Sequence, residues 1–226
     1  MMGKTHMTVG AITGAGLALA LNAPPAASVS MVLGSIFGAL LPDLDAYDST
    51  GARMIYRAAP VAGLAFFLLS PLTLNAGRGG LAGQLESRAG QACIFALLVV
   101  LFPILTAILL PHRGPTHSVL VWLVLMAVCL LWMPPGIPKF IVLSLCAGSI
   151  FGGILPDAAT RSGVPALWPI RDDRLHVLPE GYRLKTGSLF ELLLVRPSLL
   201  VVLGLLLLAL LKRYLALSHR GFSLGG

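Results

Sequence analysis

Histidine and aspartate recur at matched spacing in two separate stretches of the chain. A Thr-His pair ending at His6 precedes Asp43 by 37 residues, and a second Thr-His pair ending at His117 precedes Asp157 by 40 residues. Imidazole nitrogen and carboxylate oxygen suit Zn²⁺, Mn²⁺ or Mg²⁺ as ligands, and nothing in the pattern selects among these cations. The repeated pair therefore predicts a divalent-metal site with internal pseudosymmetry.

Each of the two aspartates ends one copy of a repeated decapeptide. The copies are GSIFGALLPD at 34–43 and GSIFGGILPD at 148–157, and eight of their ten positions are identical. In each copy an apolar stretch with glycines four residues apart runs into Pro and then Asp, so the carboxylate lies where a helix leaves its apolar surroundings. This agreement indicates an internal duplication, with repeat halves at about 1–57 and 111–170.

The stretches around these pairs hold further candidate ligands. Asp45 lies two residues after Asp43, and carboxylates so close repel one another unless a cation or protons lie between them. In PHRGPTHS at 111–118, His112 and His117 flank a Gly-Pro turn, so both imidazoles can converge. We expect the metal ligands to come from His6, Asp43, Asp45, His112, His117 and Asp157. The alternatives are structural: a helix-ending aspartate, a surface histidine, and a polar connector with incidental histidines.

Three other residues are candidates for catalysis. Arg113, in the PHRGPTHS stretch, and Arg161, in the polar stretch after the second decapeptide, could steady a developing negative charge. Arg161 could equally hold a phosphate or a lipid headgroup. Glu191 follows Ser188 at the spacing of a capping box. It could therefore cap the start of the last helix, take part in catalysis, or do both.

The composition is that of an integral membrane protein. Apolar residues make up 57% of the 226 residues, charged residues only 11%, and the mean hydropathy is +0.89. These values lie outside the range of soluble globular domains. The basic residues behind the net charge of +7 lie between apolar spans and not in one stripe, so we expect no nucleic-acid partner.

Seven helical segments are expected when the apolar stretches are compared with the roughly 20 residues that cross a bilayer. They cover 9–21, 28–41, 58–74, 91–110, 119–132, 140–155 and 189–211. The first two segments, and the fifth with the sixth, form short inner hairpins, and their four-residue glycine spacing lets helix backbones approach closely. The sequence predicts an all-α fold: a polytopic membrane helical bundle of about seven helices in one membrane domain over 1–226.

Counting the crossings places every candidate ligand on one side of the membrane. Four helices per repeat make the duplication parallel, with the halves related by an axis along the membrane normal. This side also holds ten of the 16 Lys and Arg residues, which favours the cytoplasm. The polar segment 158–188 is then a cytoplasmic loop. The chemistry would take place at the cytoplasmic face.

The chain resembles the YdjM-like family of LexA-regulated, inner-membrane-associated, predicted metal-dependent hydrolases. The motifs that carry the resemblance span nearly the whole chain: Thr5-His6, LPDLD at 41–45, HRGPTHS at 112–118, DAATRSGVPALWP at 157–169, and TGS at 186–188 with Glu191. The chain departs from the family at Gly153 and Ala46, where many members carry histidine. The resemblance implies a bacterial inner-membrane hydrolase with a divalent metal.

Together these features predict a metal-dependent hydrolase that acts on an ester or phosphoester of a membrane lipid or a lipid-linked or amphiphilic substrate. One alternative is a transporter or ion-binding protein, because parallel repeats with polar helix ends also suit alternating access. Another is a structural or regulatory membrane protein with a vestigial site, because histidine is missing at Gly153 and Ala46. The pattern leaves the substrate, the metal and the oligomeric state open.

Overall fold

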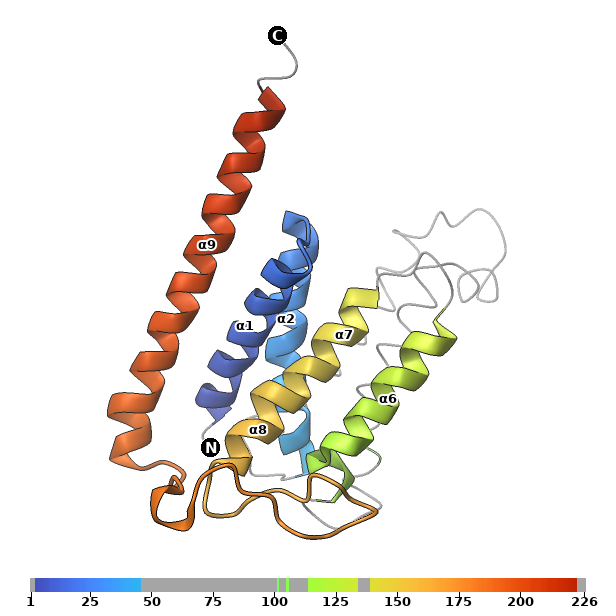
Figure 1. Ribbon diagram of the computed structural model, residues 1–226, viewed down its shortest axis with the longest axis vertical. Coiled ribbons are helices and arrows are strands. Elements are labelled where there is room, and N and C mark those ends of the chain that lie inside the picture. The colour runs from blue at the N-terminus through green and yellow to red at the C-terminus, as the bar shows by residue number, and fades with distance from the viewer. Residues whose placement is uncertain (1–2, 46–100, 102–104, 106–113, 134–138, 223–226) are drawn as a thin grey trace, which may run out of the picture.

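The computed structural model describes residues 3–45, 101, 105, 114–133 and 139–222, and their regular structure is helical (Figure 1). No strand occurs in these ranges beyond two isolated β-bridges, so the predicted all-α class is confirmed there. The α-helices are α1 (Gly3–Ala20), α2 (Pro25–Leu40), α6 (Val119–Trp132), α7 (Lys139–Ala147), α8 (Leu155–Ala158) and α9 (Arg196–Phe222). π-Helical turns cover Gly148–Ile154 and Glu191–Val195, and 3-10 turns cover Pro42–Asp45, Pro115–His117 and Glu180–Tyr182.

Helices α1 and α2 form the first predicted hairpin. The turn uses Asn22 at φ 51°, a left-handed conformation that Asn tolerates better than most residues. Pro25 then begins α2, where a missing N–H has no intrahelical partner to lose. Gly10 and Gly14 bring the two backbones together, since an added methyl group would lie 2.6 Å from the Ser35 carbonyl oxygen at Gly10.

Gly14→Ala tests this close approach. The new methyl group would lie 2.5 Å from Val32 Cα, so we expect the free energy of unfolding to fall by about 1–3 kcal/mol. Gly16→Ala on the same helix is the matched control, because nothing lies within 4 Å of its added methyl group. Ala is the better helix former, so the control should be neutral or stabilising. Thermal unfolding in detergent micelles makes the comparison, and equal midpoints for the two variants would contradict the packing.

The two decapeptides pack against each other. Helix α7, the π-helical turn and α8 form one continuous helix, Lys139–Ala158, which lies beside α2 and runs parallel to it (Figure 1). Ser35 Oγ donates to the Ser144 carbonyl at 3.0 Å, and Ser149 Oγ donates to the Gly38 carbonyl at 2.9 Å. Both decapeptides therefore end at the same end of the bundle. The duplication that explains this arrangement remains a prediction from the sequence.

Helix α9 is anchored to α1 and α2 near both of its ends. In the π-helical turn that precedes its start, Glu191 Oε1 accepts a hydrogen bond from Thr5 Oγ1 of α1 at 2.8 Å. Near its far end, the Tyr214 hydroxyl hydrogen-bonds Ser28 and donates to the Ala23 carbonyl at 3.2 Å. Between these contacts many large apolar side chains of α9 are exposed, which suits contact with lipid.

Within the described residues, two helices are long and apolar enough to cross a membrane: Lys139–Ala158 and Glu191–Ala216. Ala27–Leu40 and Val119–Trp132 are apolar but shorter. The segments predicted at 58–74 and, apart from residues 101 and 105, at 91–110 lie outside the described residues. The structure thus supports a helical membrane protein, and the number of seven helices stays a prediction.

Candidate metal centre

Three of the predicted ligands meet at one end of the bundle. His6 comes from the first turns of α1, Asp43 from the 3-10 turn after α2, and Asp157 from α8. His6 Nε2 lies 3.3 Å from Asp157 Oδ1 and 4.0 Å from Asp43 Oδ2. One ligand atom from each residue lies within 4.8 Å of the others, so the group could hold a metal ion. We call these three residues the His/Asp trio.

The three ligand atoms are spread more widely than in a loaded site. Ligand atoms at 2.0–2.2 Å from one tetrahedral cation are about 3.3–3.6 Å apart, whereas the trio spreads over up to 4.8 Å. Binding a cation would therefore draw these side chains together by up to about 1 Å. Asp43 and Asp157 each follow directly on a proline at a helix end, Pro42 and Pro156. Because α2 packs parallel to Lys139–Ala158, the two carboxylates lie at the same end of the bundle.

The hydrogen bonding of His6 leaves one ring nitrogen directed into the trio. His6 Nδ1 lies 2.8 Å from the Gly152 carbonyl oxygen, which can only accept, so Nδ1 carries the proton and donates. The imidazole is 1% exposed, and its Nε2 has no hydrogen-bond partner among the described residues. Buried polar atoms are normally satisfied. Metal-bound histidines usually donate their other N–H to a carbonyl or carboxylate, as His6 does.

His117 reaches the trio through the second oxygen of Asp157. Its Nε2 lies 3.5 Å from Asp157 Oδ2, and its Nδ1 lies 3.1 Å from Thr116 Oγ1. Asp157 therefore lies between two imidazoles, one on each carboxylate oxygen. Asp43 has a different environment: burial raises the pKa of its carboxyl, and the neighbouring His6 imidazole acts in the opposite direction.

The turn that carries His117 is held by two hydrogen-bonding side chains. Ser118 caps α6 by accepting from Val121 N at 3.3 Å, and its Oγ lies 2.8 Å from the Trp168 carbonyl oxygen, to which it donates. Trp122 Nε1 donates to the Thr116 carbonyl at 2.8 Å. The sequence placed His117 near Asp157 but gave no sign of these supports.

Glu191 is linked to the trio through Thr5, which precedes His6. It is 0% exposed, its Oε1 accepts from Thr5 Oγ1 at 2.8 Å, and its Oε2 accepts from Gly187 N at 2.8 Å. Glu191 N donates to Ser188 Oγ, which is one half of the capping box that the spacing predicted, while the carboxylate accepts from Gly187 N and not from Ser188 N. The bond to Thr5, the neighbour of His6, joins the start of α9 to α1. The catalytic role of Glu191 remains a prediction.

The other predicted site residues are not part of the trio. Arg161 is exposed on the segment 159–188, which we call the polar loop. Asp45 ends the 3-10 turn Pro42–Asp45, and its side chain lies outside the described part of the chain. His112 and Arg113 also lie outside the described residues. Their predicted roles are untested.

Gly153, where the resemblance led us to expect histidine, has no room for a side chain. A methyl group added there would lie 2.8 Å from Pro42 Cγ and 3.0 Å from the Ala39 carbonyl oxygen. The close packing of the two decapeptides occupies the space that a side chain would need. Position 153 therefore offers no ligand to the trio.

A family model described as YdjM inner membrane protein matches residues 1–222. No curated protein and no solved structure gave a significant match.

Proposed function

The chain belongs to the YdjM inner membrane protein family, and on that premise we propose that it is a metal-dependent hydrolase of the bacterial inner membrane. Its substrate would be an ester or phosphoester of a lipid-linked or amphiphilic molecule. The observation that carries the proposal is the buried His6 Nε2, which has no described hydrogen-bond partner and lies beside two carboxylates.

The donor set fits a divalent cation. His6 offers one imidazole nitrogen, and Asp43 and Asp157 offer carboxylate oxygens, a mixture that Zn²⁺, Mn²⁺ and Mg²⁺ accept. A buried and a half-buried carboxylate close to each other also favour a cation between them. These three residues would hold the metal, and His117 would orient Asp157 through its second oxygen.

A bound divalent cation would supply an acidified water and polarise the scissile ester or phosphoester. The chain's residues would prepare that reaction. His6, fixed by the Gly152 carbonyl, and Asp157, held by His117, would direct their ligand atoms toward the cation. Arg113 and Arg161 are the candidates to steady the developing negative charge. Hydrolysis would add the hydroxyl of water to the acyl or phosphoryl centre and its proton to the leaving alcohol.

The finer membrane topology belongs to the same proposal. We place about seven helices in one domain over 1–226, with parallel repeat halves and with the trio and the polar loop at the cytoplasmic face. In support, Asp43, Asp157 and the polar loop all lie at one end of the described bundle (Figure 1). Such a site at the membrane edge would meet amphiphilic substrates.

Asp43→Asn tests the proposal. It keeps the size of the side chain but weakens its oxygen as a ligand, so we expect purified protein to lose bound divalent cation and metal-dependent hydrolysis of lipid esters together. Asp172→Asn, on the exposed part of the polar loop, is the matched control and should retain both. Elemental analysis and an ester-hydrolysis assay give the two readouts. Ion flux without hydrolysis, or neither metal nor hydrolysis in a well-folded wild type, would contradict a hydrolase.

A further inference from the structure

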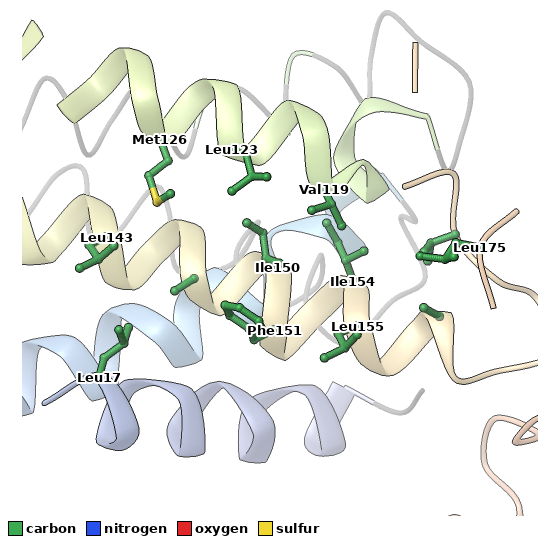
Figure 2. A pocket seen from close by; sticks show the side chains of 13 residues that line it. Leu17, Val119, Leu123, Met126, Leu143, Ile150, Phe151, Ile154, Leu155 and Leu175 are labelled. Carbon is green, nitrogen blue, oxygen red and sulfur yellow. The ribbon is translucent and has the colours of Figure 1, made fainter. Parts of the chain in front are cut away.

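A cavity of about 420 Å³ lies between α6 and the helix Lys139–Ala158 (Figure 2). All of its lining side chains are apolar. Its volume is in the range of sites that bind small molecules. The cavity follows one face of each helix, with Val119, Leu123 and Met126 on α6 opposite residues such as Ile154 on the longer helix (Figure 2).

One end of the cavity lies next to the His/Asp trio. Ala158, which lines this end, follows Asp157 directly, and Val119 lies two residues after His117. Toward the other end the cavity is lined by Leu143 and Met126 (Figure 2). From 143 to 158 the helix rises roughly 22 Å at 1.5 Å per residue. The cavity is thus an apolar slot that starts beside the trio and runs along a membrane-spanning helix.

A positive charge lies beside the end near the trio. Val164 and Leu175 line this end and pair through their backbones, with Leu175 N donating to the Val164 carbonyl at 2.8 Å. Arg174 precedes Leu175 and is exposed, and its Nη1 donates to the Ser162 carbonyl at 2.9 Å. A guanidinium held in this way is a suitable partner for a phosphate. An apolar slot with an arginine one residue before its lining Leu175 matches the two parts of a phospholipid.

We propose that the cavity holds one acyl chain of a membrane phospholipid, with the lipid phosphate at Arg174 and the ester region at the His/Asp trio. This inference rests on the proposed hydrolase function and names its substrate class. The apolar walls exclude charged or hydrogen-bonding occupants, which would leave polar groups unsatisfied. An acyl chain that lies lengthwise in the slot would bring the glycerol end of the lipid toward Asp157.

Photocrosslinking tests the occupant without requiring turnover. The full chain is reconstituted in phosphatidylethanolamine–phosphatidylglycerol vesicles that contain a trace of phosphatidylglycerol with a diazirine in its acyl chain. We expect labelling to concentrate in peptides of α6 and Lys139–Ala158, above that of the exposed α9 face. Equal labelling of α9 and cavity peptides would mean ordinary lipid contact and would overturn the proposal.

Two substitutions at the far end give opposite expected shifts. Leu143→Trp shortens the slot and should favour shorter acyl chains, whereas Leu143→Ala lengthens it and should favour longer ones. With short-chain phospholipids presented as monomers in water, each methylene kept out of the apolar slot should weaken binding about fourfold. Leu205→Trp, at a 62% exposed position of α9, is the control and should leave chain-length preference unchanged. Circular dichroism verifies the fold of each variant, and folded variants with identical chain-length preference would overturn the proposal.

The two proposals fail in different ways. Metal-dependent hydrolysis of a short soluble ester with no labelling of the cavity would overturn the lipid slot and leave the hydrolase standing. Labelling that depends on chain length, with no hydrolysis of any ester, would refute the hydrolase while supporting an acyl chain in the cavity.

Discussion

His6→Ala should abolish metal binding and hydrolysis together, with metal affinity reduced by more than the 10–100-fold that is typical of losing an outer-shell partner. The imidazole is the only nitrogen donor of the trio, and its Nε2 lies 3.3 Å from Asp157 Oδ1 and 4.0 Å from Asp43 Oδ2. Its removal leaves the carboxylates of Asp43 and Asp157 close together without the imidazole that lies beside both, so they repel each other. Calorimetric titration with Zn²⁺, Mn²⁺ and Mg²⁺ measures the affinity, and an ester assay measures the activity.

His176→Ala is the matched control for this experiment. His176 belongs to the polar loop, where its ring nitrogens lie near the backbone carbonyls of Arg174 and Arg161 and outside the trio. We expect metal affinity to stay at the level of the unmodified protein. Retention of full metal affinity by a folded His6→Ala protein would show that the trio is not the metal centre.

Glu191→Ala has the second-largest expected effect, although Glu191 lies outside the trio. The change removes the acceptor of the Thr5 hydroxyl and of Gly187 N–H in a buried place. Losing a partner there costs about 1–3 kcal/mol of unfolding free energy for each group left unsatisfied. Because Thr5 adjoins His6, we also expect metal affinity to fall by about 10–100-fold through loss of positioning. Thermal unfolding and metal titration well below the unfolding midpoint separate the two effects.

Glu191→Gln distinguishes positioning from catalysis. The amide oxygen can still accept from Thr5, while the amide nitrogen can no longer accept from Gly187 N–H. If Glu191 acts by positioning, Glu191→Gln should largely restore metal affinity, and the rate of hydrolysis should recover with it. If Glu191→Gln binds metal normally but has no activity, Glu191 acts in proton transfer. Ser188→Ala, which removes only the helix-capping hydroxyl, should lower stability without changing metal affinity.

Much of the helical structure could be predicted because apolar runs have sharp ends. The run 119–132 is bounded by a capping serine and by Met133 before two prolines, and α6 covers the same residues. The duplicated decapeptide likewise placed Asp43 and Asp157 at equivalent helix ends, and their shared position at one end of the bundle follows from parallel packing. Periodicity and composition carry this kind of information.

The hydrogen bonds around the trio could not be predicted from the sequence. Thr5 and Glu191 are 186 residues apart, and His6 and Gly152 are 146 apart. Neither pair is visible as a local pattern in the sequence. The contacts form only when α1 packs against both the start of α9 and the helix Lys139–Ala158. The tight packing at Gly153 was hidden for the same reason: its neighbours Pro42 and Ala39 belong to the other decapeptide.

The bond between Thr5 and Glu191 also orders events during synthesis of the protein. A nascent chain that has left the ribosome only as far as residue 156 carries His6 and Asp43 but lacks Asp157, and the support from Glu191 arrives 34 residues later still. The Thr5 hydroxyl of helix α1 therefore gains its Glu191 partner only after most of the chain has been made. The capacity to capture a cation is among the last properties that the growing polypeptide acquires.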